Sequence, residues 1–301
     1  MLGPKTRHFL GKVLRNRPQD LPGMVARRLV EAASAPPKGL ASARFGDVVF
    51  PVDTSLHAIA RKYYFRTHEM FLEPIFRRHL KRGSIFIDIG ANMGYWSAFA
   101  ASLVGPEGEV HAFEPVPAFH RSIERLRDAN PNHHINPLRI ALGDHSGKIE
   151  MTVVRPTAEN YANFDTNIGS SSLLPGFLDH ATALTETIVV PISTFDAFAR
   201  LAPLDLDRIG LIKIDVEGSE WACFDGMRAL LDRPGRKVPI LCEVLTDPAR
   251  SEWLDGARVV RRLEGHGYVC LDATTLAPID TSAMAFEENI LCVDAREAPK
   301  A

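Results

Sequence analysis

The apolar run at residues 85–89 is the feature that most constrains how this chain folds. Its β-branched residues, interrupted only by Asp88, are typical of a strand buried on both faces of a parallel sheet. Gly90 and Gly94 then predict a tight turn, and the apolar segment 95–104 predicts a helix. A strand, a glycine turn and a helix form the first half of a nucleotide-binding βαβ unit. The ligand that this turn binds therefore decides the class of protein.

Strand-like and helix-like segments alternate along the rest of the chain. This alternation predicts an α/β fold with one doubly wound, mostly parallel sheet, helices on both faces and a terminal antiparallel hairpin. We predict strands at 108–116, 138–144, 147–154, 187–192, 211–216, 238–244, 268–271 and 289–293, and helices at 118–129, 193–201, 219–231 and 257–264.

Three parts of the chain differ in composition. We predict a basic helical N-terminal arm and linker at 1–45, a hairpin and helical lead-in at 46–82, and the main domain at 83–296. The first 38 residues hold eight Lys or Arg against two acids, within a total net charge of −2. We expect the arm to pack its apolar side chains on the domain; the alternative is a weak peripheral contact with anionic lipid or an acidic partner. These apolar side chains include Phe9, Leu10, Val13, Leu14, Met24, Val25, Leu29 and Val30.

The overall composition excludes several classes of protein. With 46% hydrophobic and 24% charged residues, the chain resembles a soluble globular protein. No run approaches the roughly 18 apolar residues of a transmembrane segment, and the basic N-terminus lacks the apolar centre of a secretory signal. Four separated cysteines without a CxxC pair predict buried thiols and a cytoplasmic location. Because the main domain is acidic, we expect no nucleic-acid partner.

Polar residues at the ends of the first strands indicate the cofactor. Glu114 lies twenty residues after Gly94, about the spacing at which an acid accepts both hydroxyls of a ribose. The turn lacks GxGxxG, and Asp88 would repel a diphosphate but suits an ammonium group. We therefore predict S-adenosylmethionine rather than a dinucleotide. The residues expected to bind it are Asp88, Gly90, Asn92, Gly94, Glu114 and, at the end of the third strand, Asp144.

A second group of charged residues ends the later strands. With a period of two, Lys213, Asp215 and Glu217 share one face of their strand, and Glu243 interrupts the apolar run of the next. Buried charges are costly unless they compensate one another or bind a polar ligand. We interpret these residues as an acceptor site; the alternative is a half-exposed strand whose charged face meets water.

Together these stretches resemble the FkbM family of S-adenosylmethionine-dependent methyltransferases, from about residue 69 to residue 293. The shared motifs include Phe86-Ile-Asp-Ile-Gly-Ala-Asn-Met-Gly94, His111-Ala-Phe-Glu-Pro115 and Ala141-Leu-Gly-Asp144. Ile212-Lys-Ile-Asp-Val-Glu-Gly218 is the motif most particular to the family. The resemblance implies the Rossmann-like class I fold with a seven-stranded sheet, and O-methylation of a hydroxyl on a sugar, glycan or secondary metabolite. It also implies that the lead-in covers the cofactor, which would place Glu69 near it.

The expected mechanism follows from the chemistry of methyl transfer. A hydroxyl is a poor nucleophile and gains from a base, for which Asp215 is the first candidate and Glu217 and Glu243 the next. Lys213 would hold the acids ionised or orient the acceptor. The carboxylates would also suit a divalent metal such as Mg²⁺, but we favour direct base catalysis because Lys213 already supplies positive charge.

Two other functions compete with this interpretation. A nicotinamide-dependent oxidoreductase is disfavoured by the missing third glycine and by Asp88. A non-catalytic binding protein that keeps the methyltransferase fold is disfavoured by the complete set of acids at the strand ends.

Overall fold

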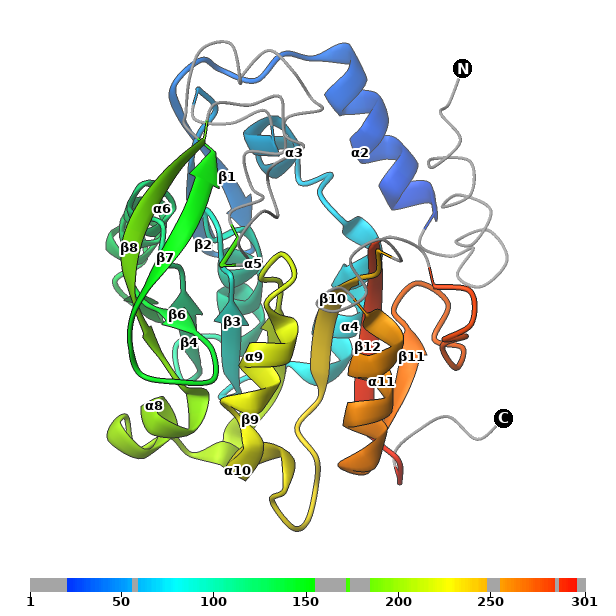
Figure 1. Ribbon diagram of the computed structural model, residues 1–301. Helices are drawn as coiled ribbons and strands as arrows, with labels where there is room; N and C mark the ends of the chain where they lie inside the picture. The colour runs from blue at the N-terminus through cyan, green and yellow to red at the C-terminus, as the bar shows by residue number, and fades with distance from the viewer. Residues whose placement is uncertain are drawn as a thin grey trace.

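A seven-stranded sheet forms the centre of the computed structural model, which describes residues 21–55, 59–154, 172–173, 185–247, 255–284 and 287–296. The strand order is β11-β12-β10-β9-β3-β4-β5, in which β12 runs antiparallel to both neighbours and the other pairs are parallel (Figure 1). The predicted mostly parallel sheet and terminal hairpin are confirmed. The strands are β3 (Ile85–Ile89), β4 (Glu109–Phe113), β5 (His134–Leu138), β9 (Ile209–Ile214), β10 (Ile240–Leu245), β11 (Tyr268–Asp272) and β12 (Glu287–Asp294).

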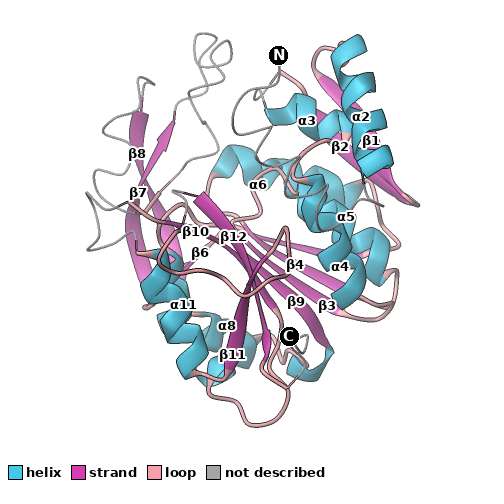
Figure 2. Cartoon of the chain, turned by 90° about the vertical axis from the view of Figure 1, so that its right-hand side faces the viewer, coloured by secondary structure: helices cyan, strands magenta, loops and turns pink. Residues whose placement is uncertain are grey.

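Helices cover both faces of this sheet, as Figure 2 shows. All five residues of β3 are buried: Phe86 packs on Phe76 with ring centroids 5.3 Å apart, while Ile85 and Ile87 belong to the core on the opposite face. The two cores explain why the strand carries apolar residues on both faces. One core contains α4 (Glu73–His79), α5 (Tyr95–Val104) and α6 (Pro117–Asp128); the other contains α8 (Phe195–Leu201), α9 (Glu220–Asp225), α10 (Arg228–Leu231) and α11 (Gly256–Gly265).

The lead-in joins the first of these cores. Phe45 and Phe50 of its hairpin pack edge-on against Tyr95 of α5, with centroids 5.3 and 6.1 Å away. The predicted hairpin is present but begins at Leu40, inside the range assigned to the arm. No helix among the described residues is long and apolar enough to cross a membrane. The lead-in comprises β1 (Leu40–Phe45), β2 (Val48–Asp53), α3 (Ile59–Phe65) and η2 (Met70–Leu72), and α2 (Leu21–Ala33) precedes it.

The prediction of the third strand was wrong. The strand beside β4 is β5, not residues 138–144, and Ala112 pairs there with Pro137. Proline is tolerated because β5 lies at the edge of the sheet, where no further strand needs its missing N–H. Residues 141–142 instead form β6 (Ala141–Leu142) of a separate sheet, ordered β6-β8-β7, with β7 (Gly147–Val154) and β8 (Thr185–Ser193). Most of the 155–186 segment and residues 1–20 of the predicted helical arm fall outside the described residues.

The predicted helix at 219–231 is divided into α9 and α10 at Gly226. A Cβ atom at this position would lie 1.9 Å from the carbonyl oxygen of Gly143, which follows β6. This close approach of the two backbones holds the second sheet, through the residue after β6, against the junction of α9 and α10. Only glycine permits it.

Replacing Gly226 with alanine should therefore destabilise the fold. We expect Gly226→Ala to lower the free energy of unfolding by about 1–3 kcal/mol, because one backbone must move to admit the methyl group. Chemical denaturation followed by circular dichroism measures this difference. Gly265→Ala is the matched control, since a Cβ on Gly265 meets no atom within 4 Å. Equal stability of the two variants would contradict the packing described here.

Candidate active site

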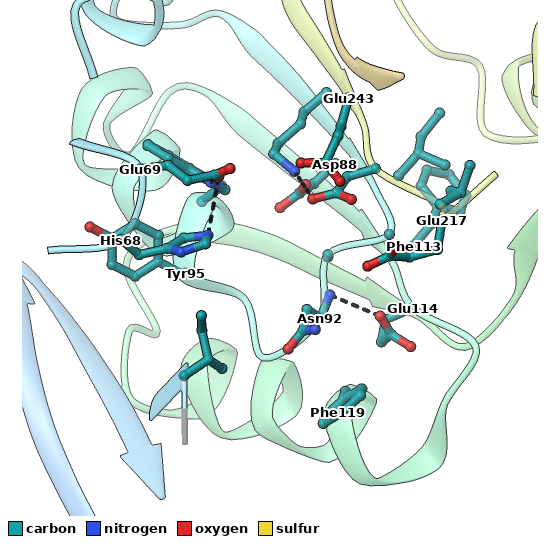
Figure 3. Close-up of a pocket in the computed structure, with 18 of the residues that line it drawn as sticks. His68, Glu69, Asp88, Asn92, Tyr95, Phe113, Glu114, Phe119, Glu217 and Glu243 are labelled. Atoms are coloured by element: carbon teal, nitrogen blue, oxygen red, sulfur yellow. Dashed lines mark hydrogen bonds and ion pairs between the residues drawn. The ribbon is translucent and has the colours of Figure 1, made fainter. Parts of the chain in front are cut away.

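A cavity of about 670 Å³ opens at the carboxyl ends of β3, β4, β9 and β10 (Figure 3). The lead-in contributes Tyr63, His68 and Glu69 to its wall, and the strand ends contribute the predicted acids. Ligands of open α/β sheets bind at this edge. The structure therefore brings the predicted cofactor and acceptor residues to one cavity, with two exceptions. One is Asp144, and the other is Gly94, which caps the N-terminus of α5 and packs against α6 instead of lining the cavity.

The turn after β3 fits between the two neighbouring strands. Gly90 has a φ of 80°, and a Cβ atom there would lie 1.9 Å from the carbonyl oxygen of Asp215. The N–H groups of Gly90 and Ala91 both donate to the carbonyl of Phe113, at 3.0 Å. Asn92 also has a positive φ, 52°, and its side chain accepts a hydrogen bond from the N–H of Met93. Gly90 is thus required by both its dihedral angle and the space available.

Glu114 fixes the same turn from β4. Its Oε2 accepts the N–H of Asn92 and its Oε1 accepts the N–H of Val116, both at 2.8 Å. Burial raises the pKa of Glu114 to about 8, although these two hydrogen bonds act in the opposite direction. The carboxyl group lines the cavity beside the turn, as predicted for a residue that binds ribose hydroxyls.

Asp88 lines the cavity and keeps one buried carboxylate oxygen without a partner in the residues that the structure describes. Ser97 Oγ donates to Oδ2 at 2.6 Å, whereas the buried Oδ1 has no hydrogen-bond partner among the described residues. Burial raises the pKa of Asp88 to about 6, although Lys213 and Ser97 favour the ionised form. An unpaired buried oxygen is costly, so this position suits a ligand that donates hydrogen bonds.

Glu69 lies in the loop between α3 and η2 and lines the same cavity. Its backbone is left-handed, with a φ of 37°, and its carboxylate lies 3.1 Å from His68 Nε2 and accepts the indole N–H of Trp96 at 3.3 Å. Burial alone would raise its pKa, but His68, Lys213 and Trp96 together lower the pKa to about 2. The expected position of Glu69 beside the cavity agrees with the structure.

Lys213 connects these acids. Its Nζ donates to Asp215 Oδ2 at 2.7 Å, and the side chain is buried. Burial would lower the pKa of Lys213, but Asp215, Glu69 and Asp88 raise it above its usual value. The lysine therefore stays charged among three carboxyl groups. The alternative of a charged face that meets water is wrong for this residue.

Two further acids, Glu217 and Glu243, join Asp215 at this end of the cavity. Oxygen atoms of Asp215, Glu217 and Glu243 all lie within 4.8 Å of one another. Strand β9 ends at Ile214, so the alternation of side chains along a strand does not explain the position of Glu217. Its position depends instead on a left-handed backbone conformation, with a φ of 52°. Burial, and then the charges of Asp215 and other nearby acids, raises the pKa of Glu243 well above its usual value. The surroundings of Glu243 therefore favour its neutral form.

The structure does not bring Asp144 to the cavity. Asp144 follows β6 of the second sheet, where its exposed carboxylate pairs with His145 at 2.6 Å. The corresponding wall is formed by Ile140, Ala141 and Leu142. The error follows from the misplaced third strand, and a role for Asp144 in binding the cofactor has no support from its position.

Aromatic side chains form a wall that the sequence analysis missed. Tyr63 stacks on Tyr95 with centroids 4.9 Å apart, and His68 packs edge-on against Tyr95 at 5.4 Å. The buried hydroxyl of Tyr95 has no hydrogen-bond partner in the described part of the chain. These residues come from α3, the following loop and α5. Among their neighbours in the lead-in, only Glu69 was predicted to lie near the cofactor.

Comparison with known proteins assigns the chain to a family. A model described as "Methyltransferase FkbM domain" matches residues 88–270. The 31-O-demethyl-FK506 methyltransferase FkbM of Streptomyces tacrolimicus is 30% identical over 241 residues, which cover 71% of this chain and 85% of that protein. The chain belongs to the FkbM methyltransferase family. It is therefore an S-adenosylmethionine-dependent methyltransferase, as the resemblance predicted.

Solved structures give weaker likenesses. A methyltransferase FkbM from Methylobacillus flagellatus shows a TM-score of 0.40 at 14% identity, covering 78% of this chain and 54% of that chain. A fibrillarin from Aeropyrum pernix in complex with S-adenosyl-L-methionine shows a TM-score of 0.35 at 12% identity, covering 71% of this chain and 68% of that chain.

The residues of this FkbM family member fit S-adenosylmethionine. The free Oδ1 of Asp88 suits the ammonium of its methionyl group, and the buried Glu114 suits its ribose hydroxyls. The turn after β3, which lines the cavity through Gly90, Ala91 and Asn92, rests on the backbone of Asp215 because Gly90 has no side chain. When bound, the cofactor supplies a methyl group on a sulfonium. The nicotinamide-dependent alternative is not supported.

Protonation of Asp88 should control cofactor affinity. Only the carboxylate attracts an ammonium, so we expect the affinity for S-adenosylmethionine to fall as the pH drops below about 6, where Asp88 takes up its proton. Isothermal titration calorimetry from pH 5 to pH 8 measures this dependence. Asp88→Asn should weaken binding by about 10-fold or more at pH 7.5 and remove the inflection near pH 6.

Ser97→Ala provides the matched variant. It deletes the hydrogen bond that favours the ionised form of Asp88, so the inflection should move to higher pH. If the inflection persists in Asp88→Asn, another group is responsible for it.

Proposed function

We propose that this methyltransferase methylates a hydroxyl group of a small-molecule or glycan acceptor, such as a sugar or a secondary metabolite. The observation that carries the proposal is the position of Asp215, which pairs with buried Lys213 at 2.7 Å. Asp215 lines the same cavity as Asp88 and Glu114, the residues predicted to bind the cofactor. The relative from Streptomyces tacrolimicus is named as a methyltransferase of 31-O-demethyl-FK506, which supports a hydroxyl acceptor.

Asp215 is the proposed base. Methyl transfer is an in-line displacement, in which catalysis depends on holding the acceptor oxygen behind the methyl group and removing its proton as the new bond forms. Lys213 contacts Oδ2 of Asp215, so Oδ1 is the oxygen that would take the proton. The same contact fixes the orientation of the carboxylate. Lys213 is thus a positioning residue for the base.

Glu217 and Glu243 have different proposed roles. Burial and nearby acids raise the pKa of Glu243 and favour its neutral form, which would donate a hydrogen bond to an acceptor oxygen. Glu217, held by its left-handed turn, would accept a hydrogen bond from a neighbouring hydroxyl. Several carboxyl groups within one small volume suit an acceptor rich in hydroxyls. They would repel an acceptor whose phosphate or carboxylate lies close to the reacting oxygen.

Removal of the proposed base should abolish turnover without affecting cofactor binding. We expect Asp215→Asn to reduce the turnover rate by about 100-fold or more, the usual contribution of a general base. Production of S-adenosylhomocysteine with a panel of glycans and hydroxylated metabolites identifies an acceptor and then measures this rate. The affinity for S-adenosylmethionine, measured by calorimetry, is the control. Wild-type turnover at unchanged affinity would exclude Asp215 as the base.

A chelator distinguishes direct base catalysis from a metal-assisted reaction. Because Lys213 already places a positive charge beside Asp215, we expect full activity after dialysis against EDTA. The three clustered carboxyl groups would otherwise suit a divalent cation with oxygen ligands. Loss of activity on dialysis, with recovery on addition of Mg²⁺ or Mn²⁺, would replace the proposed mechanism with a metal-assisted one.

A further inference from the structure

Helix α2 packs on the protein through its polar side. Arg27 donates to Glu73 and to the backbone carbonyl of Arg66, the latter at 3.0 Å, and Glu31 pairs with Arg61 of α3. Met24, a buried apolar residue of the helix, lies three and seven residues before Arg27 and Glu31 and so shares their face. Two ion pairs to the lead-in therefore determine which side of α2 faces the protein.

The opposite side of α2 is apolar and exposed. Val25, Leu29 and Val30 are 42%, 65% and 55% exposed. Leu29 follows Val25 by four residues, so these side chains form one continuous outer face. Our expectation that they pack on the domain with Met24 was wrong, because the ion pairs of Arg27 and Glu31 turn them outward. This outer face needs a different partner.

We propose that the outer face of α2, formed by Val25, Leu29 and Val30, docks on an anionic lipid surface. An apolar helix face flanked by basic residues is the usual composition of a helix that lies in a membrane interface. The first 38 residues carry eight Lys or Arg against two acids. Arg28 on α2 is exposed beside the outer face and pairs with Glu31 at 3.2 Å. Each basic residue near an anionic membrane contributes to attraction. A symmetric contact between two copies would instead bring two basic segments together, which repels.

Docking in this way has a consequence for the acceptor, and this step rests on the proposed function. Met24 and Arg28 of α2 line the cavity, and α2 lies at the outer edge of the molecule beside α3 (Figure 1). A lipid surface against α2 therefore lies close to the cavity entrance. The acceptor class that fits is an amphiphile whose hydroxylated head group projects from the lipid surface.

Vesicle sedimentation with the full-length protein tests the docking. We expect the wild-type protein to bind vesicles of phosphatidylcholine containing phosphatidylglycerol, to bind pure phosphatidylcholine more weakly, and to be released by salt. Replacing Leu29 and Val30 together by glutamate should reduce the bound fraction by about 10-fold or more. Leu201→Glu on α8 is the matched control, because Leu201 is 85% exposed and lies outside α2, and it should bind as the wild type does.

The other outcomes separate this proposal from the proposed function. Circular dichroism and the affinity for S-adenosylmethionine must be unchanged in the double variant, which shows that it folds. Equal vesicle binding by the double variant and the wild type would overturn the proposal, as would no binding by the wild type. A dimer seen by light scattering and broken by the double variant would assign the face to a second copy instead. Failure to find any hydroxyl acceptor would refute the proposed function but leave the vesicle result intact.

Discussion

The charge of Lys213 is the constraint on which the rest of the site depends. A buried ammonium is costly unless carboxylates compensate it. Here the compensation comes from three separate parts of the chain: Glu69 from the lead-in, Asp88 from β3 and Asp215 from the loop after β9. The charge is balanced only when these parts are assembled together. Packing of the lead-in, which shares its core with the main sheet, therefore also completes the charge balance at the Asp215 end of the cavity.

Much of the cofactor side of the site could be predicted from the sequence because it follows directly from buried strands. Asp88 lies near the end of the apolar run of β3 and Glu114 directly follows that of β4, and the carboxyl ends of parallel strands meet at one edge. Glu217 was predicted from an alternation that stops at Ile214, so its position depends on turn geometry that no strand pattern contains. The aromatic wall could not be predicted, since Tyr63 and Tyr95 come together only through tertiary packing.

The errors in the fold also have physical causes. The asparagine and proline of β5 hide an edge strand, and this displaced the expected third strand onto the second sheet, together with Asp144. In α2, the apolar positions predicted a buried face, but partners for Arg27 and Glu31 on the lead-in reverse the orientation of the helix. Amphipathic spacing identifies a helix and its two sides. Which side is buried depends on contacts distant in sequence.

The close approach of Gly90 to the carbonyl of Asp215 has a consequence for how such enzymes diversify. Because the main chain of the cofactor turn rests directly on the main chain that carries the proposed base, the spacing between them is set by backbone packing and not by side chains. Side chains around the entrance, in α2 and the lead-in, can then change without altering that spacing. Acceptor preference and the alignment of the reacting groups can therefore vary independently, which is a property expected of a scaffold reused for many different acceptors.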